Sequence, residues 1–354
     1  MRRRPPIRAA VKLRFDRYSR ARHARYFEPG VVYTIVSRTQ QNKFLLRPDN
    51  QGKLRAIIIG VLSKAAEKYP NVANHAAAFL SNHLHLQLSI AKHGAHPGEI
   101  CDYVGFIKRE IARRWNKEMG TKGSIWEGFD MVAVLTGPAQ VNALKYILAQ
   151  TVKERLVEHP FDWPGFHCAE SLVTGEPMEG IWFNGTAYGK KLHAERAKKN
   201  GIEPNRDDYI EKRTFSFDPL PALAHLSPED YRAEMQRLVE EVVVEAREAR
   251  GDKPVLGVDA ICSADREQSR PVPSPPWFEK RRKQIVWDNP RETEVSEYVA
   301  RYWKAQEMFR KASARWRAQN NKSTRRFPAY MCVPGFWPGR RRVRPPSHQE
   351  QSTG

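Results

Sequence analysis

The hydrophobic and polar positions in the first half of the chain follow two different periods. Some short segments are rich in β-branched and aromatic residues or alternate between apolar and polar residues, and others carry apolar residues at helical spacing. The former predict strands over residues 31–37, 74–80, 83–90 and 129–135. The latter predict helices over residues 53–69, 97–117 and 139–157. The order β-α-β-β-α-β-α predicts an α+β fold with a ferredoxin-like antiparallel sheet.

The second half of the chain predicts a largely helical, basic C-terminal extension. Ser227 and Pro228 begin a helix that Gly251 ends. Residues 271–276 (PVPSPP) predict a semi-rigid spacer, and residues 294–317 predict a last helix rich in Lys and Arg. No internal repeat is found.

These patterns divide the chain into five parts. They are a basic N-terminal arm (1–27), an α+β domain (28–170), a helical extension (171–270), a Pro-rich spacer with a basic helix (271–321) and a basic Pro-rich tail (322–354).

The charge of the chain is strongly positive. Sixty Lys and Arg residues stand against forty Asp and Glu residues, which gives a formal net charge of +20. No apolar run approaches the roughly 18 residues that cross a bilayer, so a membrane protein is not expected. The four cysteines are far apart and form no C-x-x-C pair, which argues against a disulfide scaffold and favours a reducing cytosol. A polyanion is the partner that this charge favours.

Cations are concentrated at both ends of the chain. Among them are Arg2, Arg3 and Arg4 near the start, and Arg340, Arg341 and Arg342 near the end. Such runs are often solvated surface, and an Arg-rich start is also typical of an organelle transit peptide. Because both ends of the chain carry such runs, we interpret these arginines as contacts to nucleic-acid phosphates, which would make binding depend on salt.

The segment SNHLHLQLSI at residues 81–90 carries the clearest chemical pattern. Successive strand residues point to opposite faces, so leucines and Ile90 share one face while His83, His85, Gln87 and Ser89 share the other. The leucine face is expected to pack against helices and the histidine face to remain open. Two imidazoles one pleat apart can ligate one divalent metal, although two ordinary surface histidines would look the same.

The predicted helix at residues 139–157 has a polar side opposite its apolar stripe. Tyr146, Gln150 and Lys153 fall on this polar side, and the first two are neighbours at i and i+4. Taken alone, the pattern is also that of a solvated helix face with a half-buried tyrosine. Tyr146 can take part in a reaction only if a metal site lies nearby.

In this context the chain resembles a known family of DNA-processing enzymes. Ser81-Asn82-His83-Leu84-His85 resembles the HUH (His-hydrophobic-His) motif of single-tyrosine transposases, and more closely that of the REP-associated tyrosine transposases. Trp126 in an expected loop, the segment at residues 146–157 (YILAQTVKERLV) and the D-W-P-G sequence at residues 162–165 follow in the family's order. The resemblance covers residues 28–170, about 40% of the chain. It departs from the family at Gln150-Thr151, where Asn-Pro is usual.

The resemblance implies a mechanism of DNA strand cleavage and joining. Tyr146 would attack a phosphorus of single-stranded DNA and form a 5′-phosphotyrosyl intermediate, with a free 3′-hydroxyl as the other product. His83, His85 and Gln150 would hold Mg²⁺ or Mn²⁺ beside the scissile phosphate. Lys153 would stabilise the phosphate or the phenolate.

The resemblance also bears on partners and location. It implies single-stranded or hairpin DNA as the partner, no membrane association, and a cytoplasmic, nucleoid-associated protein. The chain would act as a monomer or as a homodimer, because related families complete the site within one chain or between two.

Other interpretations remain open at this point. The chain can be a DNA-binding protein that keeps the fold but not the cleavage activity. A structural zinc protein would need further soft ligands, which the sequence lacks. Glu127 and Asp130 can bind metal but are more often solvated, and Asp162-Trp163-Pro164 is more typical of a packing turn.

Overall fold

The computed structural model describes residues 25–91, 98–198, 201–269, 286, 293–318 and 331–332. The Pro-rich spacer at residues 271–276 lies outside the described residues. So do the arginines expected to contact phosphate at the two ends, which are Arg2, Arg3, Arg4, Arg340, Arg341 and Arg342. None of the described helices is long and apolar enough to cross a membrane.

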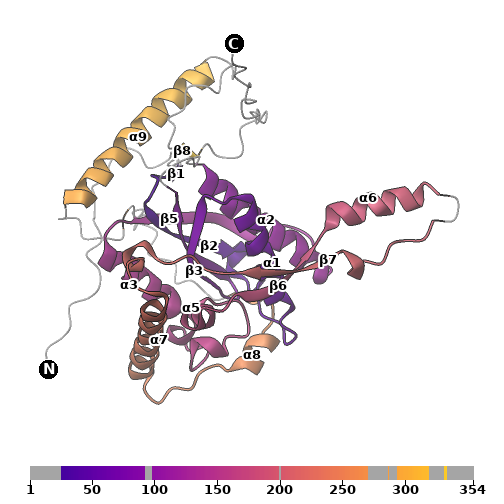
Figure 1. Ribbon diagram of the computed structural model, residues 1–354, viewed down its shortest axis with the longest axis horizontal. Coiled ribbons are helices and arrows are strands. Elements are labelled where there is room, and N and C mark those ends of the chain that lie inside the picture. Colours follow the sequence, from indigo (N-terminus) through magenta and orange to yellow (C-terminus); the bar gives the residue numbers. More distant parts are fainter. Residues whose placement is uncertain are drawn as a thin grey trace, which may run out of the picture.

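A four-stranded antiparallel sheet forms the centre of the molecule (Figure 1), in the order β3-β4-β2-β5. Its strands are β2 (Val32–Thr39), β3 (Val72–Phe79), β4 (His83–Ile90) and β5 (Trp126–Val134). The helices between them are α1 (Lys53–Lys68) and α2 (Glu99–Glu118). The strand order and the antiparallel pairings confirm the predicted α+β fold class.

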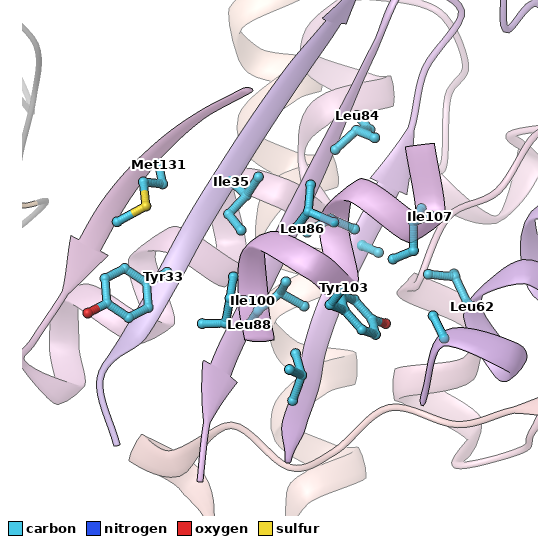
Figure 2. Packing of buried hydrophobic residues seen from close by; sticks show 14 of the residues in the cluster. Tyr33, Ile35, Leu62, Leu84, Leu86, Leu88, Ile100, Tyr103, Ile107 and Met131 are labelled. Carbon is cyan, nitrogen blue, oxygen red and sulfur yellow. The ribbon is translucent and has the colours of Figure 1, made fainter. Parts of the chain in front are cut away.

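The leucine face of β4 packs against α1 and α2, as its alternation predicts. Figure 2 shows Leu84, Leu86 and Leu88 in one layer with Tyr103 and Ile107 of α2. All five side chains are fully buried. This layer is the larger of the two hydrophobic clusters.

The histidine face of β4 is not open, contrary to the sequence-based expectation. It is covered by a second layer of helices: α3 (Gly137–Leu148), α5 (Ala169–Thr174) and α7 (Pro228–Arg250). Strand β3 is apolar on this side, with Ala78 directly opposite His85. Gln87 is fully buried, and its amide Nε2 donates to the Gln140 carbonyl at 2.9 Å.

The predicted helix at residues 139–157 is interrupted. It ends as α3 at Leu148, and a short helix α4 (Gln150–Lys153) follows before Arg155 adopts a left-handed conformation with φ 57°. The side-chain Nε2 of Gln150 donates to the Tyr146 carbonyl at 2.8 Å. In a regular helix that carbonyl accepts from the backbone N–H four residues later, so the side chain competes with the helix at this point.

The sequence suggested a helical extension over residues 171–270, but this segment also contains two strands. Strands β6 (Met178–Phe183) and β7 (Ile210–Phe215) form an antiparallel hairpin, and α6 (Gly185–Arg196) projects from it away from the body (Figure 1). We call the segment from β6 to β7 the arm. The sequence of β7, IEKRTF, is mostly exposed and polar, so no apolar alternation marks it as a strand.

The remaining elements are short or belong to the C-terminal part of the chain. A last long helix, α9 (Thr293–Ala318), agrees with the helix predicted for residues 294–317. Arg301 of α9 pairs with Glu28 at 2.9 Å. The other elements are α8 (Val258–Ser263), β1 (Arg25–Tyr26), β8 (Met331–Cys332) and the 3-10 turns Gln40–Asn42, Pro160–Asp162, Asp207–Tyr209 and Pro221–Leu223.

Two glycines let β6 of the arm lie directly on α1. A Cβ atom at Gly60 would stand 1.8 Å from the Ile181 carbonyl oxygen, and one at Gly180 would stand 2.6 Å from the Ala56 carbonyl oxygen. The foot of the arm is also fixed to α2, because the Arg114 guanidinium lies 3.6 Å from the centre of the Trp182 ring. The arm is therefore attached by backbone contact that admits no side chain.

Replacing Gly60 by alanine tests this contact. Alanine normally stabilises a helix interior by about 1 kcal/mol relative to glycine. We expect Gly60→Ala to lower the free energy of unfolding by about 1–3 kcal/mol instead, because β6 must move away from α1. Gly105→Ala in α2 is the matched control, since a Cβ there meets nothing within 4 Å. Denaturant titration measures both, and an equal gain in stability for both variants would contradict the contact.

His167 is a buried histidine next to Cys168 and Ala78 of the smaller hydrophobic cluster. Its side chain is 6% exposed, and its Nδ1 accepts from the Ala169 N–H at 3.2 Å. Burial lowers the pKa of His167 to about 4. The neutral ring is therefore the form that the folded protein holds.

His167 makes stability depend on pH between about 6.5 and 4. The unfolded chain binds a proton in this window and the folded chain does not, so the free energy of unfolding falls as the pH is lowered, by up to about 1.4 kcal/mol per pH unit. We expect His167→Gln to flatten this slope and to leave the profile above pH 7.5 parallel to that of the unmodified protein. Denaturant titrations across this range give the slopes, and equal slopes below pH 6.5 would contradict the assignment.

Candidate active site

Two histidines and a tyrosine meet at one end of the polar face of β4. His83 and His85 come from β4, and Tyr146 comes from α3, which crosses this face. The ring centroids of His83 and His85 are 5.0 Å apart, and those of His85 and Tyr146 are 5.6 Å apart. One chain therefore brings its own tyrosine against its own histidines.

These side chains line a cavity of about 640 Å³. Gln150 reaches it from α4, and three carboxylates, from Glu127, Asp130 and Glu154, stand along its wall. The cavity thus combines imidazole, phenol, amide and carboxylate groups in one place. Arg38 is the one arginine that the described residues contribute to its wall.

The two histidines differ in their surroundings. The Nδ1 of His83 lies 2.7 Å from the Oδ1 of Asn82, which assigns the ring proton to Nδ1 and makes Nε2 the basic nitrogen. His85 is 4% exposed, and no described residue forms a hydrogen bond with its buried Nδ1. Burial, and then neighbouring cationic groups including Lys153, hold the pKa of His85 well below its usual value. A neutral imidazole is the form that ligates a metal.

Tyr146 and Gln150 share one stretch of backbone. Gln150 is 3% exposed, and its amide Nε2 is used by the Tyr146 carbonyl. The amide oxygen is then the atom that Gln150 offers to a cation. The Nζ of Lys153 lies 4.7 Å from the centre of the Tyr146 ring, where its charge favours a developing phenolate.

The donor set can hold a divalent cation. Two imidazole nitrogens and an amide oxygen are all metal ligands, and the buried Nδ1 of His85 has no hydrogen-bond partner among the described residues. Within the described ranges, no three His, Cys, Asp or Glu side chains form a cluster at metal-binding distances. The expected site therefore depends on the amide of Gln150, which lines the same cavity, for its third ligand.

Two residues quoted for the family resemblance have packing roles. Trp126 is not in a loop but begins β5, where its Nε1 donates to the Lys108 carbonyl at 2.9 Å. This hydrogen bond holds Trp126 against α2 at the start of the strand. The polar residues around Trp126 gave no sign of a strand in the sequence. The Nε1 of Trp163 donates to the Phe79 carbonyl at 3.1 Å, so this side chain is part of the core.

The sequence analysis did not find Arg38 and Glu154 as residues of this cavity. Arg38 is directly opposite His83 in the register of β2 and β4, and Glu154 follows the short helix α4. Only the strand register and the break after Leu148 bring them here. Neither was readable from the spacing of residues along the chain.

Comparisons with known proteins add little at the level of sequence. No protein-family model matches the chain, and no curated protein matches it. Among solved structures, the chain is similar to a REP-associated tyrosine transposase bound to a REP hairpin, with 18% identity and a TM-score of 0.34 over 44% of this chain and 86% of that one. It is also similar to a putative transposase from Deinococcus radiodurans, with 18% identity and a TM-score of 0.24 over 37% of this chain and 98% of that one. At these scores the likenesses add nothing to the argument from the site.

Proposed function

We propose that the protein is a metal-dependent endonuclease and transposase that acts on single-stranded DNA at hairpin or repeat elements. The observation that carries this proposal is the contact of His83, His85 and Tyr146 in one cavity, with ring centroids 5.0 and 5.6 Å apart. A nucleophile beside two metal-ligating side chains is what phosphoryl transfer through a covalent intermediate needs.

Tyr146 is the nucleophile in this proposal. Its Oη forms a bond to the scissile phosphorus, the bond from phosphorus to the 3′-oxygen breaks, and the phenol proton leaves with that oxygen or with water. The product is a 5′-phosphotyrosine and a free 3′-hydroxyl. A second 3′-hydroxyl then attacks the same phosphorus and releases Tyr146. Because the phosphotyrosine conserves the energy of the phosphodiester, no nucleotide cofactor is required.

The chain's own residues prepare this step. His83, His85 and Gln150 would hold Mg²⁺ or Mn²⁺, which neutralises charge on the phosphate oxygens when it is bound. Asn82 fixes the orientation of His83, and burial keeps His85 neutral. Lys153 lies close enough to the Tyr146 ring to favour the phenolate.

The charge of the chain supports a nucleic-acid substrate. A net charge of +20 attracts DNA over long distances and makes binding depend on salt. A cytoplasmic, nucleoid-associated location is the one that such a substrate favours. Since one chain assembles the site, the proposal needs no second chain for catalysis.

A covalent adduct with DNA is the direct test of the enzyme. We expect the protein, incubated with Mn²⁺ and a hairpin oligonucleotide with single-stranded flanks, to form a species that survives denaturing electrophoresis. Tyr146→Phe should abolish it, since phenylalanine has no attacking oxygen. Tyr188→Phe on α6 is the control, because this tyrosine bonds Glu203 on the arm. DNA binding without any adduct in the unmodified protein would favour a DNA-binding protein that lacks cleavage activity.

Metal binding gives a separate test that does not depend on activity. We expect His83→Ala, His85→Ala and Gln150→Ala each to weaken Mn²⁺ binding at least about tenfold, since each removes one ligand. Calorimetric titration or the paramagnetic resonance of bound Mn²⁺ measures the affinity. His193→Ala on the exposed surface of α6 is the control. Unchanged affinity after removal of both histidines would place any bound ion elsewhere.

A further inference from the structure

A second, smaller cavity of about 340 Å³ lies next to the candidate active site. It opens between α4 and the C-terminal end of α7. Four cationic side chains line it, together with one carboxylate. The cations are Lys153, Arg155, Arg250 and Lys253, and the carboxylate is Glu245.

Two carboxylates beside this cavity have cationic partners. Glu245 pairs with Lys145 at 3.0 Å, and Glu158 pairs with Arg250 at 2.6 Å. No carboxylate in the described part of the chain pairs with Lys153, Arg155 or Lys253. The cavity therefore holds positive charge that the described residues do not neutralise.

Arg155 occupies a backbone position that favours glycine. Its φ of 57° is left-handed, a conformation in which a side chain strains the backbone. The position is fixed from outside, since the Arg155 carbonyl accepts from the Leu256 N–H at 2.8 Å and the Leu156 carbonyl accepts from the Gly257 N–H at 3.0 Å. Glycine would meet these constraints without strain, so the turn itself does not call for an arginine at this position.

The end of α7 explains only part of this charge. Cations near a helix C-terminus are favourable because of the helix dipole, which accounts for Arg250 and Lys253. It gives no reason for a left-handed arginine in a separate loop. An anionic ligand between the two elements gives one.

Lys153 lies between the two cavities, because it lines the smaller one and contacts Tyr146, which lines the larger one. Its Nζ lies 4.7 Å from the centre of the Tyr146 ring. We propose that the smaller cavity binds a backbone phosphodiester of the DNA strand, next to the phosphodiester that Tyr146 attacks. The inference rests on the proposed function. Arg155 is the main contact, because a guanidinium can bind two phosphate oxygens at once.

Substitutions of Arg155 separate binding from folding. In a Tyr146→Phe background, which prevents cleavage, we expect Arg155→Ala and Arg155→Gly to weaken binding of a fluorescent single-stranded oligonucleotide several-fold. The slope of log affinity against log salt should fall by about 0.7, the value for one phosphate contact on a single strand. Arg155→Lys should keep most of the slope. Arg155→Gly should melt no lower than the unmodified protein, because glycine relieves the left-handed strain.

Controls decide between the inference and its alternatives. Arg196→Gln removes an exposed charge from α6, on the arm, and should leave the slope within error. Equal slopes for Tyr146→Phe with and without Arg155→Ala, with normal adduct formation by the Arg155→Ala single variant, would overturn the inference and leave the proposed function standing. No adduct and no oligonucleotide binding in the unmodified protein would overturn both. A further outcome is that inorganic phosphate raises the melting temperature only when Arg155 is present, while oligonucleotide affinity is the same with and without Arg155. In that case the cavity is a site for free anions and the inference is wrong.

Discussion

Strand β4 lies inside the sheet with helices over both of its faces, and this double burial governs the rest of the structure. The side chains on the polar face must each find a partner, because an unsatisfied buried polar group costs about 1–3 kcal/mol. The amide nitrogen of Gln87 finds one in α3. The imidazole of His85 has a buried Nδ1 without one among the described residues. The packing thus leaves a buried ring nitrogen of His85 without a hydrogen bond from the described residues, next to Tyr146.

The helix that accepts a hydrogen bond from the Gln87 amide nitrogen also supplies the tyrosine. α3 must lie close to β4 for the Gln140 carbonyl to reach Gln87, and Tyr146 follows less than two turns later on the same helix. The break after Leu148 then turns Gln150 back toward the Tyr146 carbonyl and the cavity. Fold stability and site geometry are therefore set by the same contact between one strand and one helix.

Much of this arrangement was readable from the sequence, for definite physical reasons. The period of two in residues 83–90 separates leucines from histidines whatever the tertiary structure, so the strand and its inner face were predictable. What covers the polar face depends on residues far along the chain, and the sequence wrongly suggested that it is open. Arg38 enters the cavity through strand register, and β7 is a strand only because β6 pairs with it. Such long-range pairings leave no local periodicity.

Helix α6 of the arm is ordered without any contribution from the hydrophobic core. Helix α6 buries no side chain and has 12 residues, a length at which an isolated helix is marginal in water. Its contacts are local, because the Asn184 side chain caps it and Tyr188 packs against Phe183 and Tyr209 and donates to Glu203. Since no residue of α6 belongs to either hydrophobic cluster, loss of this helix would leave the packing around the sheet unchanged.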